Sequence, residues 1–267
     1  QPQSAIRPLL LTKLYPYLPM MKNSSANVLK MFFGFRLNET DHPFYSHLLR
    51  WHNTSRIQNY FSDNLKTELT DYNPVNEVYK NIESNFSNWG DLSKSQYLES
   101  TIFMSGYLLS SQGDRMAMAN SVEGRYPFLD YRVIEYAAKL PEDYKLRILN
   151  EKYILKKMMA GKIPDSILKR NKQAYRAPIH TSFFGQGAPA YVDDMLSAES
   201  LKKFGCFDAD KVGKLVEKYR NGSTISEIDN MALAGILSTQ LVNLQFIERN
   251  DFNSGESNLA NLRIIRE

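Results

Sequence analysis

Apolar residues recur at helical spacing along almost the whole chain, and the period-two alternation of half-buried strands is nearly absent. After Ser226, for example, apolar side chains fall at Leu233, Ile236, Leu237 and Leu241. Steps of three and four residues place such side chains on one face of a helix. Prolines and glycines divide the chain into segments of ordinary helix length. The sequence therefore predicts a mainly α chain with about ten helices and no strand pattern.

Small polar residues mark where several of these helices begin, because their side chains accept hydrogen bonds from the first free N–H groups. The predicted N-caps are Asp130, Asp208 and either Asp91 or Ser93, and the last long helix is predicted to begin at Ser226. The helix after Asp91 is expected to be long and to continue towards Met116. We expect one helical domain over residues 1–250 and a frayed polar tail over residues 251–267.

Composition excludes several classes of protein. The chain has 267 residues, of which 43% are hydrophobic and 23% charged, as in globular proteins. Its net charge of +4 is spread along the sequence, so neither nucleic acid nor a membrane surface is an expected partner. Cys206 is the only cysteine, which excludes an intrachain disulfide and fits a cytoplasmic location. No apolar run reaches the ~18 residues that a membrane span needs.

The segment 106–178 contains two turns in which charged residues lie close to a proline. In the first turn, Glu123 and Arg125 precede Pro127, which disfavours helix at the residue before it. A carboxylate and a guanidinium on irregular backbone between helices suit a functional site. The alternative is structural: these groups, with Arg115 and Asp130, form ion pairs and caps that fix the crossing of the two helices.

The second turn has four positive charges in eight residues, Lys169, Arg170, Lys172 and Arg176, followed by Pro178. Ammonium and guanidinium groups on a loop suit a phosphate or a developing oxyanion, although a solvated basic loop has the same composition. The sequence has no P-loop, GxGxxG, HExxH, CxxC or GxSxG motif. The spacing of His47 and His52 does not favour a metal site, and no metal ligand is predicted.

Together these stretches resemble a known family. DRMAMANSVEGRYPFLDYRVIEYAAKLP, EKYILKKMM and RNKQAYRAP, all within 106–178, are similar to the C-terminal part of glutamine-dependent asparagine synthetases. The resemblance implies a multi-helix part of an adenine nucleotide alpha hydrolase-like α/β domain whose parallel sheet lies largely outside this chain. It also implies an enzyme that uses ATP and Mg²⁺ to activate the aspartate side-chain carboxylate as an acyl-adenylate, which ammonia derived from glutamine then converts to the amide.

The resemblance also assigns roles to residues of the two turns. Lys172 matches the active-site lysine of the Arg-x-Lys motif, where it would neutralise the α-phosphate and the departing pyrophosphate. Glu123 matches the glutamate before Pro-Phe-Leu-Asp, and in ring-closing relatives a glutamate in this region assists removal of a proton from the nucleophile. Arg125, Arg170 and Arg115 are expected to bind substrate or phosphate. Asp130 is expected to cap a helix.

The chain departs from the family pattern in three segments. Ser-Gly-Gly-x-Asp-Ser, Ser-Gly-Glu-Gly-x-Asp-Glu and the amino-terminal cysteine are not found in it, and it begins with Gln1. We therefore expect a fragment that is inactive alone, with ATP and Mg²⁺ bound mainly by regions absent from it. Its partners would be the glutaminase and nucleotide-binding segments, and exposed apolar surface would favour a homo-oligomer. Two alternatives stay open: an amide- or ring-forming synthetase for another carboxylate, and a non-catalytic helical scaffold.

Overall fold

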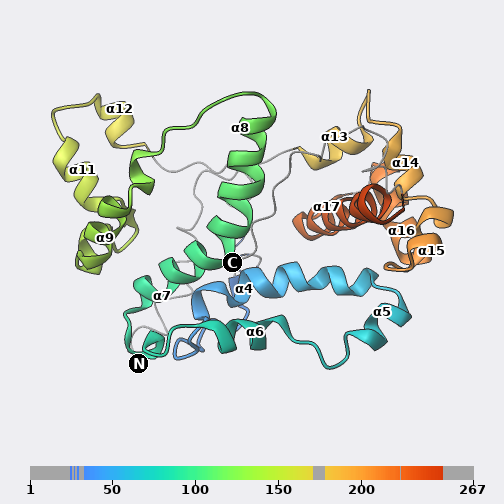
Figure 1. Ribbon diagram of the computed structural model, residues 1–267, viewed down its shortest axis with the longest axis horizontal. Helices are drawn as coiled ribbons and strands as arrows, with labels where there is room; N and C mark the ends of the chain where they lie inside the picture. Colours follow the sequence, from blue (N-terminus) through green and yellow to red (C-terminus); the bar gives the residue numbers. More distant parts are fainter. Residues whose placement is uncertain are drawn as a thin grey trace, which may run out of the picture. The chain divides into compact units, whose positions relative to one another are not determined.

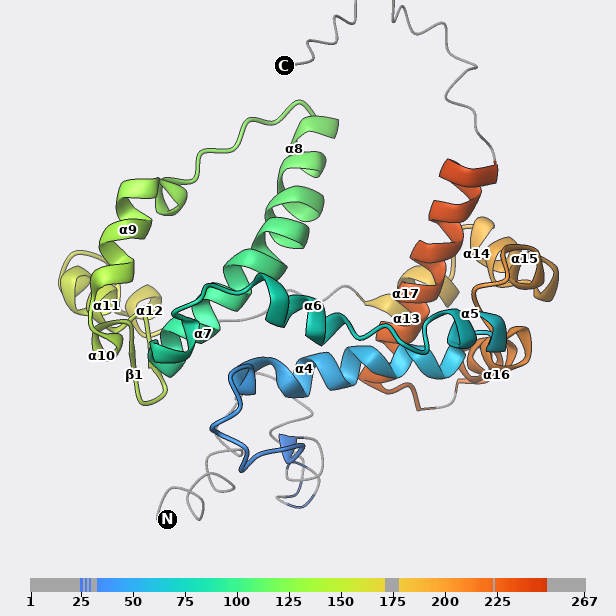
Figure 2. The same cartoon turned by 60° about the horizontal axis from the view of Figure 1, so that its bottom comes forward.

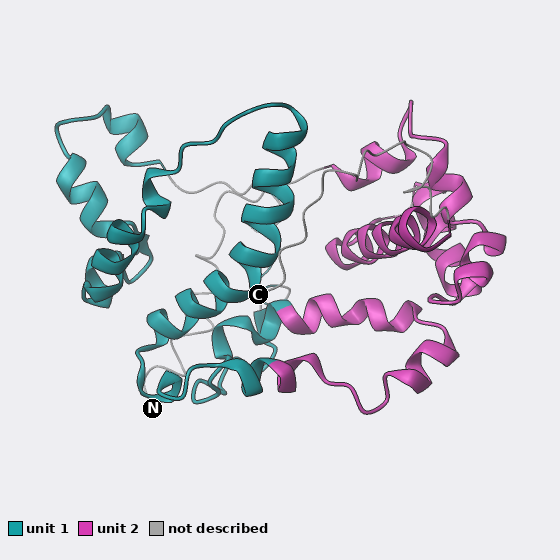
Figure 3. Cartoon of the chain, viewed as in Figure 1, with its two compact units in different colours: residues 1–50, 78–174 teal, residues 51–77, 175–267 magenta. Residues whose placement is uncertain are grey.

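A computed structural model describes residues 25, 27, 29, 33–170, 178–222 and 224–248 of the chain. Within these residues the fold is mainly α, as the sequence predicts, and runs from α4 to α17 (Figure 1). More helices are present than expected because several predicted helices are interrupted. The chain forms two compact units, which Figure 3 colours separately. Unit 1 comprises residues 1–50 and 78–174, and unit 2 comprises residues 51–77 and 175–267. The predicted single domain over 1–250 stays a prediction, and residues 251–267 lie outside the described part.

The helix predicted to run towards Met116 is present in unit 1, but its middle is wider than an α-helix. It consists of α7 (Asp91–Leu98), a π-helix (Glu99–Asp114) and α8 (Arg115–Ala119). π-Helices have i→i+5 hydrogen bonds and are rare. Apolar steps of four and five residues, such as Phe103 to Tyr107 and Leu108, suit this wider turn better than the steps of an α-helix do.

The start of α7 corrects a prediction. Neither Asp91 nor Ser93 is the N-cap: Gly90 has that position, and Asp91 is the first helical residue. The backbone N–H of Ser93 instead donates to Glu142 Oε1 at 3.0 Å, and the Ser93 hydroxyl donates to the same oxygen at 3.1 Å. A carboxylate 49 residues away therefore caps this helix, and local sequence patterns do not reveal such a partner.

An aromatic cluster forms the buried centre of unit 1. Phe44 and Phe86 are almost completely buried, and their ring centroids are 6.0 Å apart. Tyr79 contacts Phe44 at 4.3 Å, while Trp89 and Tyr97 each lie 5.6 Å from Phe86. These tilted and edge-on arrangements are favoured for aromatic pairs. The cluster joins the loop before α4 (Tyr45–Ser55), the end of α6 (Pro74–Asn81), the 3₁₀ turn Phe86–Asn88 and α7.

The remainder of unit 1 is a group of short elements that lie beside one another in both views (Figures 1 and 2). They are α9 (Tyr131–Lys139), α10 (Glu142–Lys145), β1 (Leu146–Arg147), β2 (Asn150–Glu151), α11 (Tyr153–Met159) and α12 (Asp165–Leu168). The antiparallel pair β1–β2 was not predicted, and it places Glu151 in a strand rather than at the start of a helix. Its turn residue Ile148 has φ +56° and a side chain that is 83% exposed.

Unit 2 contains the larger hydrophobic core. It is formed by α13 (Ile179–Phe184), α14 (Tyr191–Met195), α15 (Ala198–Phe204), α16 (Ala209–Arg220) and α17 (Glu227–Val242), and a π-helix (Asn243–Glu248) follows. Of the apolar positions predicted after Ser226, α17 buries Leu233, Ile236 and Leu237, and Leu241 is half-buried. Asp208 and Ser226 cap α16 and α17, which confirms both predictions. Ser226 and Asp229 form a reciprocal capping box.

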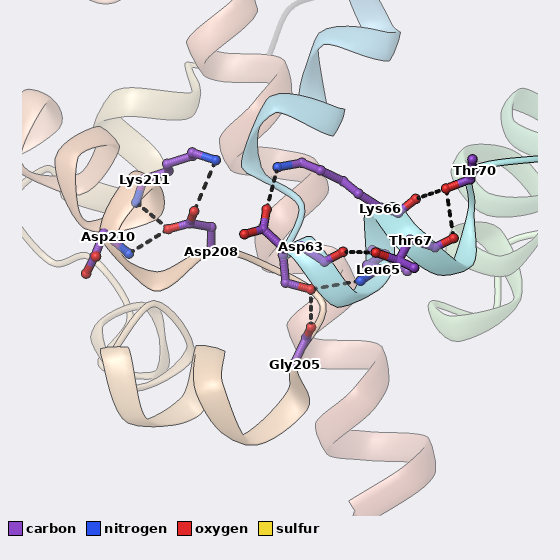
Figure 4. A network of polar contacts seen from close by, with 10 residues as sticks. Asp63, Leu65, Lys66, Thr67, Thr70, Gly205, Asp208, Asp210 and Lys211 are labelled. Carbon is purple, nitrogen blue, oxygen red and sulfur yellow. Dashed lines mark hydrogen bonds and ion pairs between the residues drawn. The ribbon is translucent and has the colours of Figure 1, made fainter.

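The segment 51–77 joins this core through backbone pairing. It contains a 3₁₀-helix (Arg56–Tyr60) and α5 (Asp63–Glu68). Phe61 forms an isolated antiparallel bridge with Phe207, and their rings lie 5.9 Å apart. Figure 4 shows the surrounding polar contacts, in which the Ser62 hydroxyl donates to the Gly205 carbonyl at 2.7 Å. The pairing explains how residues distant in sequence fold as one unit.

Candidate functional site

The first predicted turn begins where α8 ends, and this end is a Schellman motif. The N–H of Val122 donates to the Ala117 carbonyl at 2.8 Å, and that of Ser121 donates to the Met118 carbonyl at 3.1 Å. Ser121 has φ +54°, the left-handed conformation that this motif usually gives to glycine. A non-glycine residue in that conformation costs roughly 1–2 kcal/mol. The backbone that leads into Glu123 is therefore strained, and such strain is common beside functional sites.

Glu123 and Arg125 are brought together by this turn. Arg125 Nη2 donates to Glu123 Oε2 at 2.9 Å, and Arg125 Nη1 donates to the Gly124 carbonyl at 3.2 Å. Both side chains are 79% exposed, so their mutual attraction adds little to stability. The pair instead presents an oriented carboxylate and a guanidinium to solvent. This geometry agrees with both interpretations of the turn, the structural ion pair and the wall of a site.

The turn then ends at α9, as the sequence predicts. Pro127–Leu129 forms one 3₁₀ turn, and Asp130 Oδ1 accepts a hydrogen bond from the Arg132 N–H at 2.9 Å. Asp130 is thus the N-cap of α9, which confirms its predicted structural role. The Arg132 side chain also grips both carboxylate oxygens of Asp130, at 2.9 and 2.6 Å. These side-chain bonds, followed by the backbone bond, hold the pKa of Asp130 below its usual value.

Arg132 was missed by sequence reasoning, which considered Arg115 and Arg125 as the ion-pair partners in this region. The available signal was the Asp-x-Arg spacing at a helix start, which places a guanidinium within reach of the capping carboxylate. Arg132 contacts both oxygens of Asp130, and among the described residues no ion pair joins Asp130 to Arg125 or Arg115. The bidentate contact therefore fixes the exit of the turn and leaves the Glu123–Arg125 pair separate from the cap.

The remaining predicted site residues are not brought to this pair by any described contact. Arg115 is the exposed first residue of α8, and no ion pair is formed by it within the described part of the chain. Arg170 is exposed just after α12, where its N–H donates to the Ile167 carbonyl at 3.2 Å. The neighbouring Lys169 pairs with Asp165 at 2.6 Å. Lys172, the central residue of the second turn, lies outside the described residues.

The described residues contain neither a cluster of metal-binding side chains nor a helix that could cross a membrane. No group of three or more His, Cys, Asp or Glu side chains is arranged to hold a metal ion among the described residues. The described helices also include none with the length and apolar character needed to cross a bilayer. His47 is buried and lies 3.5 Å from Glu99, so its surroundings are those of a packed side chain.

Comparison with known proteins gives relatives for part of the chain. Asparagine synthetase [glutamine-hydrolyzing] 1 of Bacillus subtilis is 36% identical over 123 residues, which are 45% of this chain and 19% of that protein. The amidase chyE of Penicillium rubens is 33% identical over 138 residues, 49% of this chain and 20% of the amidase. Asparagine synthetase [glutamine-hydrolyzing] 3 of B. subtilis is 32% identical over 121 residues, 45% of this chain and 19% of that protein.

These matches extend over about a fifth of the length of the relatives. No solved structure matches the chain significantly. The family model described as asparagine synthase matches residues 9–244, which include both predicted turns and most of the two units. This match covers far more of the chain than the stretch 106–178 on which the sequence resemblance rests. The chain therefore belongs to the asparagine synthase family.

Proposed function

We propose that this chain is part of an ATP-dependent synthetase that adenylates the aspartate side-chain carboxylate and forms the amide with ammonia derived from glutamine. The family match over residues 9–244 carries this proposal. The two bacterial asparagine synthetases among its relatives support aspartate over another carboxylate. The same matches favour an enzyme over a scaffold without catalytic activity.

The exposed cations of the two turns suit the charge that such a reaction develops. In the first step the aspartate carboxylate bonds to the α-phosphate of ATP and pyrophosphate leaves; in the second step ammonia bonds to the activated carbonyl and AMP leaves. Positive groups near the phosphates stabilise the charge that develops on both leaving groups. Lys172 would neutralise the α-phosphate and pyrophosphate oxygens. Arg170, two residues earlier and exposed, would hold the same phosphates, and Arg115 could serve a phosphate from α8 because no carboxylate pairs with it among the described residues.

Glu123 would act on the second half of the reaction. An ammonia molecule that attacks the activated carbonyl must lose a proton, and a carboxylate within hydrogen-bonding distance can accept it. The Arg125 contact at 2.9 Å orients one oxygen of Glu123 and leaves the other oxygen to solvent or substrate. Arg125 would thus position Glu123 while its remaining donors contact the carboxylate or phosphate of the substrate.

The residues that would hold ATP and Mg²⁺ are only partly found in the described chain. The guanidinium groups of Arg115 and Arg170 fit the phosphates, since both are exposed and carry several donors. No group of three or more His, Cys, Asp or Glu side chains is arranged to hold a metal ion within the described residues. We therefore assign no step to Mg²⁺ and propose that its ligands, and most contacts to ATP, come from other segments of the synthetase.

The two half-reactions allow a sharp test in the intact synthetase that contains this chain. Aspartate-dependent exchange of pyrophosphate into ATP reports adenylation, whereas asparagine formation reports both steps. Glu123→Gln should retain exchange and lower asparagine formation by about 10²- to 10⁴-fold, the usual contribution of a general base. Glu135→Gln is a matched control because Glu135 is exposed on α9, and it should leave both rates unchanged.

The outcomes separate the proposed roles. Equal losses of exchange and amide formation in Glu123→Gln would show that Glu123 acts in adenylation or in folding, and a normal melting temperature would exclude folding. Absence of aspartate-dependent exchange in the wild-type synthetase would contradict the proposed substrate. A glutaminase segment as partner and a cytoplasmic location are part of the proposal, the latter resting on the single Cys206. Self-association is likewise proposed, from exposed apolar side chains such as Met118 and Phe128.

A further inference from the structure

A polar cavity of about 500 Å³ lies in unit 1, apart from the Glu123–Arg125 turn. One wall is the loop before α4 with its first residues, including Thr40, Asp41 and Ser46, and the other wall is the first turn of α7. The volume falls within the range of small-molecule sites in proteins, which is ~300–1,000 Å³. The cavity is therefore large enough for a small metabolite.

The charged groups of this cavity are of both signs. Lys94 and Asp91 line it from α7, and Asp41 lines it from the loop. Asp91 and Lys94 are three residues apart and so share one face of the helix. None of these three side chains forms an ion pair within the described part of the chain. One ammonium and two carboxylates thus border the same space without neutralising one another.

The start of α7 has backbone N–H groups, one of which donates to a carboxylate of this chain. The first N–H groups of a helix have no partner within the helix and attract negative charge. Gly90, at the N-cap, has no side chain to accept from them. Glu142 accepts from the N–H of Ser93 only, so the N–H groups of Asp91 and Leu92 are not capped by it. Because the Glu142 carboxylate already faces this helix end, the attraction of a ligand carboxylate rests on the Lys94 ammonium.

Both walls are held by hydrogen bonds of the loop and by the buried aromatic rings of Phe44 and Phe86, not by the charged groups. The Phe44 N–H donates to His42 Nδ1 at 3.1 Å, and the Tyr45 hydroxyl donates to the Leu37 carbonyl at 2.7 Å. Phe44 is completely buried and contacts Phe86, which precedes α7 and packs against Trp89. Since one aromatic cluster holds both walls, the cavity is present before any ligand binds. Such preorganisation reduces the entropic cost of binding.

We propose that this cavity binds a zwitterion of amino-acid size, with its carboxylate at Lys94 and its ammonium at Asp41 and Asp91. Phosphate or another simple anion would meet two carboxylates, and a simple cation would meet Lys94. Only a ligand with both charges satisfies all three groups, and unpaired charges oppose the alternatives. The proposal rests on this geometry and is independent of the synthetase reaction.

The test is saturation-transfer NMR on the purified chain with L-asparagine as the probe. Succinamate lacks the ammonium of this probe and 3-aminopropanamide lacks its carboxylate, so each should bind at least 10-fold more weakly. Lys94→Met should weaken L-asparagine binding at least 10-fold. Lys139→Met, a matched change of an exposed lysine on α9, should leave it unchanged.

The aspartates provide a crossed test. Asp91→Asn and Asp41→Asn should each weaken binding of L-asparagine. They should also reduce the ratio of the affinity for L-asparagine to the affinity for succinamate, because each removes only a group that recognises the ammonium. The proposal is overturned if wild-type chain shows no saturable signal with L-asparagine. It is also overturned if phosphate binds as tightly, or if Lys94→Met retains wild-type affinity. A misfolded Lys94→Met, detected by its melting curve, leaves the two aspartate variants to decide.

Discussion

The cap that Glu142 supplies to α7 leads to a prediction about a glycine. An added Cβ at position 90 would overlap Glu142 Oε1, although the backbone angles of Gly90 (φ −64°, ψ 158°) are available to any residue. Gly90→Ala should therefore displace the carboxylate and free the N–H of Ser93. Loss of an N-cap costs roughly 0.5–2 kcal/mol, and loss of a charge-assisted hydrogen bond costs a similar amount. We expect Gly90→Ala to lower the free energy of unfolding by ~1–2 kcal/mol.

A double-mutant cycle isolates this interaction from other effects of the alanine. Glu142→Ala should cost about as much as Gly90→Ala, since both remove the same cap, and the double variant should cost little more than either. Glu142→Gln retains an acceptor oxygen and should cost less. Urea unfolding followed by the fluorescence of Trp89 reports on this region, in a Trp51→Phe background because the chain has 2 tryptophans. If the losses of unfolding free energy in the two single variants simply add in the double variant, Gly90→Ala does not act by displacing the Glu142 carboxylate.

Three further predictions concern local features. Ser121→Gly should raise the free energy of unfolding by about 0.5–1 kcal/mol because it relieves the left-handed serine, and a destabilised variant in urea unfolding would contradict this. Tyr219→Phe should lower the free energy of unfolding by ~1 kcal/mol, because the buried hydroxyl donates to Asn230 Oδ1 at 2.7 Å. In an Asn230→Ala background, tyrosine and phenylalanine at position 219 should give the same free energy of unfolding. Burial by itself raises the pKa of Asp229, but hydrogen bonds from Lys218 and Ser226 outweigh this effect and hold that pKa below its usual 3.8. Its contribution to stability is thus complete above that value and is lost as the pH falls through the lower folded pKa; Asp229→Asn should abolish this part of the acid-induced destabilisation, measured by urea unfolding between pH 5 and 2.

Local sequence patterns were sufficient where a helix is stabilised by its own neighbours. Asp208 and Ser226 bond to N–H groups two or three residues ahead, and Asp130 does the same for α9. The apolar face of α17 was likewise visible, because Leu233, Ile236 and Leu237 are buried where the periodicity placed them. In these cases the interaction that decides the structure lies within a few residues of the pattern.

Prediction failed where the partner comes from elsewhere in the chain. Glu142 displaced the local candidates Asp91 and Ser93 because the fold brings its carboxylate to the end of α7. The β1–β2 pair was missed because each strand has only two residues, too short for alternation to be seen. Its turn also uses Ile148 at positive φ, which the usual turn residues would not indicate.

The sequence named the residues of the candidate site but indicated only some of the contacts between them. The spacing of Glu123 and Arg125 on an irregular turn indicated an ion pair, and the structure confirms that contact at 2.9 Å. The sequence pattern did not indicate that Arg132, rather than another arginine, forms the ion pair with Asp130. The roles assigned to Lys172, Arg170 and Arg115 stay predictions from the family resemblance, because no described contact brings these residues together with Glu123.

The most direct test of the proposed function is the turnover of the intact synthetase with Lys172 changed to alanine. If Lys172 neutralises the phosphates as adenylation proceeds, Lys172→Ala should lower kcat by about 30- to 1,000-fold, equivalent to ~2–4 kcal/mol of transition-state stabilisation. The affinity for ATP should change little, and the matched variant Lys169→Ala, whose ammonium pairs with Asp165, should retain wild-type turnover. Wild-type kcat in Lys172→Ala would contradict the assignment of this turn to the active site.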